Sequence, residues 1–410
     1  MPDPAGPLAG TLVVDLTRAL AGPHAGMVLA DLGARVVKVE TPGGGDDTRG
    51  WGPPFVEPEG GPGDGSDRQS TYFMSCNRGK ESVALDLKSD DGRRYLTALV
   101  ERADVLLENF RTGVLDRLGF GTERLLQLNP RLVVLSITGF GHDGPEGGRA
   151  GYDQIAQGEA GLMSITGSGP DDPQRVGTPI ADLLAGMTGV HGVLAALLER
   201  ERTGRGQVVR TSLLASVVGV HAFQGTKWTV AGEVGRAQGN HHPSISPYGL
   251  FRCADGSVQI AVGSEGLWKR FCDGFGLDPA LEGFATNPER VARREEVVTL
   301  VEELFASWSA ADLLARLAEI GVPAGKVRTI DEVYTWEQTA SQGLLVDVEH
   351  ATLGTVTLPG PPLRFFDADG AETTRREHRA PPLLDGDGDA VRAWLDGKSL
   401  DADAHREQGA

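Results

Sequence analysis

The sequence predicts an α/β protein with a parallel sheet, joined to a smaller α+β domain. Over the first third of the chain, short apolar strands alternate with helical patterns, which is typical of a parallel sheet covered by helices on both faces. The chain has 410 residues, and single hydrophobic cores stop growing at about 250–300 residues. We therefore expect two domains.

The large domain is expected over residues 1–200. Its helices are predicted at residues 23–32, at 91–103, where apolar residues recur at helical spacing, and from Thr122 onward. Its strands are predicted at residues 11–16, 35–40, 105–108 and 132–138. This order of strands and helices indicates a Rossmann-like domain.

A long helix is predicted from Thr178 to Gly204. Threonine is a good N-cap, Pro179 suits the first helical position, and the glycine follows the charged residues 199–202. A strand at residues 208–213 falls within a linker that we place at residues 201–229.

The smaller domain is expected over residues 230–334. A turn at residues 254–256 lies between two strand patterns and predicts a hairpin. Helices are predicted within residues 288–307 and over 310–320. Residues 335–410 are interpreted as a linker and a C-terminal segment that returns to the large domain, with one helix at 389–395.

Charge and cysteine content restrict the partners and the compartment. The net charge of −18 argues against nucleic acid and anionic membranes as partners, because both need a basic surface. Three cysteines without metal or disulfide spacing favour a reducing compartment. Asp15 and Arg18 interrupt the apolar N-terminal stretch, and no run approaches the roughly 20 apolar residues of a membrane span. A cytoplasmic protein is expected.

An acidic protein that binds an anionic ligand needs a local group of cations. Three basic residues lie between Asn77 and Lys88, and four arginines elsewhere could join them. The expected set is Arg18, Arg49, Arg78, Lys80, Lys88, Arg111 and Arg117.

Residues 139–144 have the literal pattern G-x-G-x-x-G directly after a predicted strand. In a dinucleotide site, a helix begins there so that its N-terminus faces the pyrophosphate. Residues 145–148, Pro-Glu-Gly-Gly, cannot begin one. We interpret the segment as a glycine loop and do not expect NAD.

Metal sites are not expected either. Residues 385–389 resemble the start of a calcium loop, but Ala390 stands where glycine is needed and Asp396 where glutamate is usual. A solvated turn is the better interpretation. The histidines show no H-x-x-x-H spacing, which argues against zinc. The pair His241-His242 lies in a predicted loop and could line a substrate pocket.

Asp182 is the most informative acid of the long helix. One interpretation is an acid stabilised by the helix macrodipole, which is worth about 0.3–1 kcal/mol. Gly186, Gly189 and Gly192 follow it and lower helix propensity. Such a cost makes sense where another backbone or a bulky ligand must approach closely, so a functional role is the alternative.

Several short motifs together resemble the class III CoA-transferases, the family of formyl-CoA and carnitine-CoA transferases that also includes α-methylacyl-CoA racemase. Their order and spacing match that family nearly from end to end. The motifs lie at residues 15–23, 32–40, 77–80, 104–110, 152–153, 181–182, 203–207 and 239–243.

The resemblance implies an interlocked homodimer that transfers CoA from an acyl-CoA donor to a carboxylic acid, without a metal. Asp182 matches the family's nucleophile, which forms aspartyl anhydride and aspartyl-CoA thioester intermediates. The positions that match CoA contacts are Arg18, Ala19, Ala21, Leu85, Lys88, Asn109, Phe110, Arg117 and Tyr152.

The chain departs from the formyl-CoA branch at four places. That branch has basic residues where this chain has Thr41 and Ala150, and a glutamine where it has Leu20. Residues 239–248 replace a glycine-rich loop, which weakens the case for formate or oxalate as acceptor. The residues that hold the CoA phosphates therefore stay open.

Two alternatives remain beside CoA transfer. A 2-methylacyl-CoA racemase needs two proton-transfer groups, and similar racemases have a histidine before the aspartate that matches Asp153. Here that residue is Tyr152, whose ordinary pKa of about 10 suits a base poorly. A non-catalytic CoA-binding protein is the second alternative. Neither acyl donor nor acceptor can be inferred.

Overall fold

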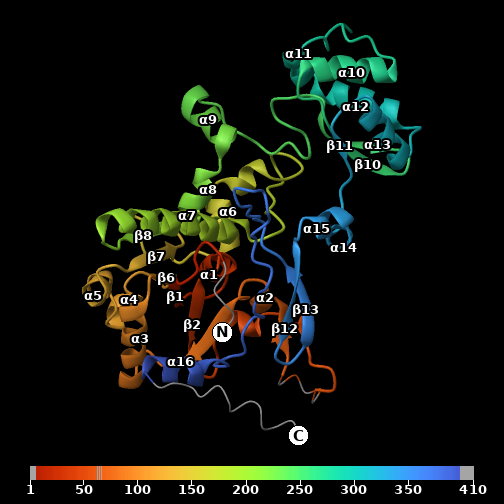
Figure 1. The fold of residues 1–410 in the computed structure, drawn as a ribbon. Coiled ribbons are helices and arrows are strands. Elements are labelled where there is room, and N and C mark those ends of the chain that lie inside the picture. The colour runs from red at the N-terminus through yellow and green to blue at the C-terminus, as the bar shows by residue number, and fades with distance from the viewer. Residues whose placement is uncertain (1–5, 62, 64, 66, 398–410) are drawn as a thin grey trace. The chain divides into compact units, whose positions relative to one another are not determined.

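The computed structural model describes residues 6–61, 63, 65 and 67–397, and the chain divides into two compact units (Figure 1). The larger unit contains the residues up to 160, residues 177–223 and the residues from 337 onward. The smaller unit contains residues 161–176 and 224–336. Segment 161–176 thus belongs to the smaller unit, although the long helix that follows it belongs to the larger one.

The larger unit is built on a six-stranded sheet in which every neighbouring pair is parallel, as expected. The strand order is β5-β2-β1-β6-β7-β8. Val14 pairs with Val37 on one side and with Leu106 on the other. The strands are β1 (Leu12–Asp15), β2 (Arg35–Glu40), β5 (Lys80–Ala84), β6 (Val105–Glu108), β7 (Val133–Thr138) and β8 (Val208–Ser212).

Helices cover both faces of this sheet. On one face, Leu96 and Leu99 of α3 pack in a core with Val14 and Leu106. On the other face, α7 lies against Leu135 of β7. The helices of this unit are α1 (Ala21–Asp31), α2 (Thr71–Met74), α3 (Asp90–Arg102), α4 (Val114–Arg117), α5 (Thr122–Leu128), α6 (Asp153–Glu159), α7 (Ile180–Thr203), α8 (Leu213–Gly219), α15 (Glu337–Ser341) and α16 (Gly388–Leu395).

The long helix α7 begins at Ile180, two residues later than predicted, and ends at Gly204 in the left-handed conformation, as predicted. Its glycines allow close packing. A Cβ on Gly186 would lie 2.6 Å from the backbone oxygen of Ala21 in α1, and one on Gly189 would lie 2.7 Å from Leu135. The low helix propensity of this segment is therefore explained by close contact with neighbouring elements.

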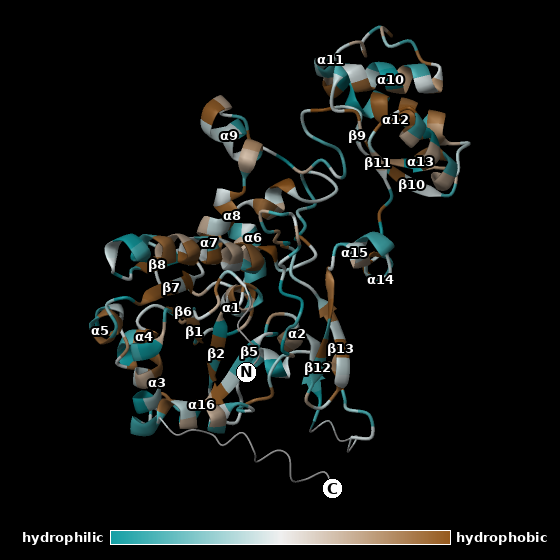
Figure 2. Cartoon of the chain, in the orientation of Figure 1, coloured by the Kyte–Doolittle hydropathy of each residue, from teal (hydrophilic) through white to brown (hydrophobic). Residues whose placement is uncertain are grey.

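By length and composition alone, α7 could cross a membrane, contrary to the sequence expectation. Its 24 residues include a window of mean hydropathy 1.6. The helix packs against α1, β7 and β8, and Figure 2 shows hydrophobic residues along α7 and these two strands. Core helices of globular proteins have the same composition, so this feature alone is weak support for a span.

The acidic segment at residues 385–389 closes an edge of the sheet. The edge strand β5 has unpaired backbone N–H groups, which Asp385 and Asp387 bind. The N–H of Ala84 donates to Asp385 Oδ1 at 2.8 Å, and that of Ser82 donates to Asp387 Oδ2 at 3.0 Å. The interpretation as a solvated turn was therefore wrong, because these carboxylates satisfy strand donors that would otherwise be left unpaired.

The smaller unit contains the expected hairpin of β9 (Tyr248–Cys253) and β10 (Gly256–Ala261), paired antiparallel. Phe251, Val258, Phe271 and Phe305 lie in its core. The single helix predicted within residues 288–307 is two helices. Its other elements are α10 (Glu265–Phe275), α11 (Asn287–Ala292), α12 (Arg294–Phe305), α13 (Ala310–Glu319), β11 (Ala324–Gly325) and α14 (Ile330–Tyr334).

The remaining elements lie outside these sheets and cores. Helix α9 (Ala222–Ala231) follows α8 and buries none of its residues. Two small antiparallel ribbons belong to the larger unit. They are β3 (Phe55–Val56) with β4 (Gln69–Ser70), and β12 (Leu345–His350) with β13 (Gly354–Pro359).

Candidate active site

The strand order marks one place on the sheet as a natural ligand site. From β1 the chain continues to β2 and β5 on one side, and from β6 it continues to β7 and β8 on the other. The order therefore reverses between β1 and β6. In open α/β sheets, ligands bind beyond the carboxyl ends of the strands at such a switch point.

Four of the predicted CoA-contact residues lie at this switch point, where they follow the carboxyl ends of β1 and β6. The backbone N–H of Arg18 donates to Asn109 Oδ1 at 2.9 Å, and Asn109 Nδ2 donates to the carbonyl of Arg18 at 2.7 Å. The guanidinium of Arg18 lies 5.9 Å from the ring centre of Phe110. Ala19, the next residue, adopts a φ of 64°. The two hydrogen bonds between Arg18 and Asn109 join the loops after β1 and β6 into one edge.

The other predicted contact residues are spread along the same unit. Ala21 begins α1, Leu85 is buried just after β5, and Lys88 is exposed two residues before α3. Arg117 ends α4 and is exposed, while Tyr152 precedes α6 with 63% of its surface exposed. Whether these five residues contact CoA stays a prediction.

Asp153 is fully engaged at the start of α7. Its Oδ1 accepts the backbone N–H of Ala181 at 2.8 Å, and its Oδ2 accepts Nε2 of Gln157 at 2.8 Å. The cap expected from Thr178 is thus provided by an aspartate of α6. Asp153 binds one of the N–H groups that a helix leaves free at its N-terminus.

Asp182 is the residue after Ala181 and lies in the first turn of α7. It is half-buried, and within the described part of the chain its carboxylate makes no hydrogen bond or ion pair. Burial, and secondly the negative charge of Asp153, raise the pKa of Asp182 to about 7. The helix macrodipole stabilises the ionised carboxylate by about 0.3–1 kcal/mol, which is less than the cost of burial beside another carboxylate.

Sequence reasoning missed Tyr72, which lies in the short helix α2. Burial, and then the negative charge of Asp182, raise the pKa of this phenol to about 12, with Asp153 contributing. Its ring meets that of Trp51 edge-on, with 5.0 Å between the centres. Tyr72 therefore shares an electrostatic environment with Asp182. The two lie 110 positions apart in the chain, and no local pattern connects them.

Three members of the expected cation set are neutralised inside the protein. Arg49 pairs with Glu40 at 2.7 Å, Arg78 with Asp31 at 2.5 Å and Lys80 with Asp15 at 2.8 Å. Their charges are therefore not available to a ligand. The remaining members have no carboxylate oxygen within 4.0 Å in the residues that the structure describes. They are Arg18, Lys88, Arg111 and Arg117.

The histidine pair lies in the smaller unit, where aromatic contacts hold both rings. His242 stacks on Tyr248 with 5.0 Å between ring centres, and His241 meets Phe251 edge-on at 5.4 Å. Burial, followed by the positive charge of Arg294, lowers the pKa of both histidines. We therefore expect both rings to be neutral near pH 7.

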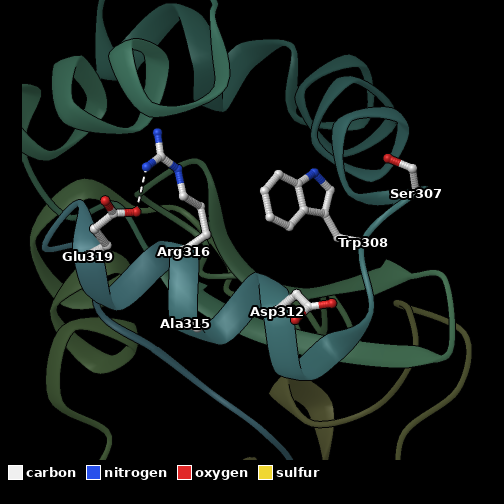
Figure 3. A pocket seen from close by; sticks show the side chains of 6 residues that line it. All are labelled: Ser307, Trp308, Asp312, Ala315, Arg316 and Glu319. Carbon is white, nitrogen blue, oxygen red and sulfur yellow. Dashed lines mark hydrogen bonds and ion pairs between the residues drawn. The ribbon is translucent and has the colours of Figure 1, made fainter.

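The smaller unit also carries a hollow of about 600 Å³ on one side of α13 (Figure 3). Trp308 and the paired side chains of Arg316 and Glu319 line it, with 2.6 Å between the charged atoms. None of the predicted site residues lies there. The hollow is therefore no part of the candidate active site.

These features describe an α/β protein with a ligand edge at a switch point and an unpaired aspartate of raised pKa. The model of CoA-transferase family III matches residues 8–388. The chain is 43% identical to succinate–glutarate CoA-transferase of Agrobacterium fabrum, over 88% of this chain and 89% of that protein. It is 36% identical to human succinyl-CoA:glutarate CoA-transferase, over 92% and 83%. For acetyl-CoA:oxalate CoA-transferase of Acetobacter aceti, the identity is 38% over 95% and 96%.

Solved structures agree with the sequence relatives. A CAIB/BAIF family protein of Brucella suis has a TM-score of 0.83 at 41% identity, with 95% of this chain and 100% of that chain covered. A Mycobacterium tuberculosis protein has a TM-score of 0.81 at 31% identity, with 95% and 99% covered. The chain belongs to CoA-transferase family III, and it is a class III CoA-transferase, as the sequence predicted.

Proposed function

We propose that this enzyme moves CoA between carboxylic acids by covalent catalysis at Asp182. The observation that carries the proposal is the contrast between two neighbouring acids. Asp153 uses both carboxylate oxygens to hold the start of α7, whereas Asp182 has no partner in the described residues. A nucleophile needs free lone pairs, so Asp182 is the acid suited to that role.

The proposed chemistry conserves the activated acyl group without water or a redox step. The Asp182 carboxylate attacks the donor thioester, the C–S bond breaks, and CoA leaves as a thiolate from an aspartyl-acyl anhydride. The thiolate attacks the aspartyl carbonyl, which releases the donor acid as its carboxylate and forms an aspartyl-CoA thioester. The acceptor carboxylate then reverses these steps. Asp182 must be ionised for the first attack, so its pKa of about 7 limits activity at low pH.

We further propose a dicarboxylic acid as the acceptor and a dicarboxylic acyl-CoA as the donor. The Agrobacterium fabrum and human relatives are named for succinate or succinyl-CoA with glutarate, and a Haloarcula hispanica relative at 37% identity is named succinyl-CoA:mesaconate CoA-transferase. Succinyl-CoA with glutarate is the first pair to test, because the relative at 43% identity is named for succinate and glutarate and the human relative for succinyl-CoA and glutarate. The different loop at residues 239–248 gives no support to formate or oxalate as the acceptor.

The proposed state is a homodimer, interlocked as the family resemblance implies. Support comes from apolar side chains that the chain leaves exposed around α9. Trp228 is 59% exposed, Val230 83% and Val234 62%. A partner chain that covers them would remove this apolar surface from water. The cytoplasmic location stays a prediction.

The test compares Asp182→Asn with Asp153→Asn. We expect Asp182→Asn to lose transfer from succinyl-CoA to glutarate, since an amide is a poor nucleophile, and Asp153→Asn to retain it. Enzyme incubated with succinyl-CoA alone and then with hydroxylamine should carry a hydroxamate on the peptide that contains Asp182. Turnover by a verified, non-deamidated Asp182→Asn variant, or a hydroxamate on Asp153, would overturn the assignment.

Racemisation is tested separately. The exposed phenol of Tyr152 stands where similar racemases have a histidine, so we expect no exchange of the α-proton. A 2-methylacyl-CoA incubated with enzyme in D₂O without acceptor acid should take up no deuterium above the rate without enzyme. Rapid uptake, measured by mass spectrometry, would instead favour the racemase alternative.

A further inference from the structure

This chain has Thr41 and Ala150 where the formyl-CoA branch has basic residues. Another cation must therefore bind the CoA phosphates. We propose that the guanidinium of Arg18 binds a phosphate of CoA and that the Thr41 hydroxyl positions it. This inference rests on the proposed CoA-binding function and deepens it. It assigns one cation and one positioning residue to the phosphate-bearing part of the ligand.

The first support is the way Arg18 is held. Its backbone is joined to Asn109 by the two hydrogen bonds described above, at 2.9 and 2.7 Å. Its side chain donates from Nη2 to Thr41 Oγ1 at 2.8 Å, directly after β2 ends. Arg18 therefore links the carboxyl ends of β2, β1 and β6, and Phe110 supports its guanidinium from within cation–π range. A side chain restrained in this way loses little further freedom when it binds an anion.

The second support is the local charge balance. Three buried acids near this edge are already neutralised, Asp15 by Lys80 at 2.8 Å, Glu40 by Arg49 at 2.7 Å and Asp46 by Lys38 at 2.9 Å. The fourth, Glu108, accepts hydrogen bonds from Ser136 and from the N–H of Phe110, and burial raises its pKa. Arg18 has no carboxylate oxygen within 4.0 Å in the described residues, and its side-chain partner is a neutral hydroxyl. Its charge is thus uncompensated at the switch point of a protein whose net charge is −18.

The third support is the chemistry of the pair Arg18 and Thr41. Where relatives of the formyl-CoA branch have a basic side chain at the position of Thr41, this chain has a hydroxyl that accepts a hydrogen bond from an arginine three residues after β1. Arg18, which follows the neighbouring strand β1, thereby places a positive charge at the end of β2. A planar guanidinium has five N–H donors and suits the oxygens of a phosphate group.

The experiment is equilibrium binding of CoA, 3′-dephospho-CoA and pantetheine to the full-length wild-type protein and to variants. We expect Arg18→Gln to weaken CoA binding at least tenfold, because hydrogen bonds between charged groups are strong, and to leave pantetheine binding within twofold of wild type. Arg124→Gln, which changes an exposed arginine of α5, is the matched control and should bind CoA as wild type does.

The Thr41 variants test positioning separately. Thr41→Val keeps the shape without the hydroxyl and should weaken CoA binding about threefold, whereas Thr41→Ser should restore it. In Arg18→Gln, the dissociation constant for CoA should also depend less on salt than in wild type, because one charge contact is missing. If Arg18→Gln weakens CoA binding but the salt dependence of the dissociation constant stays as in wild type, the effect is structural and contradicts a phosphate contact.

Comparison of CoA with 3′-dephospho-CoA also identifies which phosphate group Arg18 contacts. If the effect of Arg18→Gln disappears with 3′-dephospho-CoA, the contact is to the 3′-phosphate; if it persists, the contact is to the diphosphate. Equal weakening of pantetheine and CoA, or unchanged CoA binding by Arg18→Gln, overturns the proposal. A Thr41→Val variant that binds like wild type overturns the positioning role. Wild-type protein that binds no CoA would instead contradict the proposed function.

Discussion

Replacing Asp182 by asparagine should stabilise the fold at alkaline pH, even though it removes the proposed nucleophile. Burial and Asp153 raise the pKa of Asp182 from 3.8 to about 7. The native state therefore binds this proton more tightly than the unfolded state does. Between about pH 4 and pH 7, the free energy of unfolding of the wild type falls as pH rises, because folding then requires either proton uptake or a buried charge.

The size of the effect follows from the pKa shift. A rise of the pKa from 3.8 to about 7 corresponds to about 4 kcal/mol at most, since each tenfold change in proton affinity is worth about 1.4 kcal/mol. Because the carboxyl is only half-buried, solvent screening lowers this figure, and we expect about 2 kcal/mol. Asparagine does not titrate. Asp182→Asn should therefore match the wild type below pH 4 and exceed its stability by about 2 kcal/mol at pH 8.

Urea unfolding at a fixed protein concentration, measured from pH 4 to pH 8, gives the difference between variant and wild type directly. Asp172→Asn is the control without a pH slope in this range. Hydrogen bonds from Ser168 and then Gln174 lower the pKa of Asp172 below its ordinary value of 3.8, so the carboxyl is ionised in both states above about pH 5, and the difference from wild type should stay constant from there to pH 8. A difference for Asp182→Asn that is constant across this pH range, or that favours the wild type at pH 8, would refute the reasoning.

Two further predictions concern the surroundings of Asp182. In Asp153→Asn, the pH at which kcat/KM reaches half its maximum should fall, because the negative charge that raises the pKa of Asp182 is gone; an unchanged pH profile would mean that burial alone sets this pKa. Gly186→Ala should cost about 1–3 kcal/mol in urea unfolding, because the added Cβ would overlap the backbone of α1. Gly219→Ala, where the Cβ meets nothing within 4 Å, should leave stability unchanged or raise it, and equal losses would contradict the packing argument.

The secondary structure was predictable because it depends on neighbours in sequence. The strands at Arg35–Glu40 and Val105–Glu108 have the limits that their apolar runs indicate, and Gly204 ends α7 as its left-handed preference requires. The break between α11 and α12 was missed because the helical period continues across it. The family was also predictable, since its motifs keep their order and spacing along nearly the whole chain.

The electrostatics of the site could not be predicted from the sequence. Lys80 was expected to face a ligand, but it is buried against Asp15, 65 positions earlier. Asp182 was expected to be stabilised as an anion by its helix. Asp153, from a different helix, binds the N–H group of Ala181 and adds a like charge.

Local sequence therefore determined five of the six strands of the central sheet, the long helix α7 and the family of this protein, because backbone propensity and apolar period act between residues that are close in the chain. Only the tertiary structure decided which charges are neutralised, which acid is unpaired and where Arg18 meets Thr41. Coulomb energy and desolvation depend on distance and burial in space. Those quantities are set only once residues far apart in the chain have packed together.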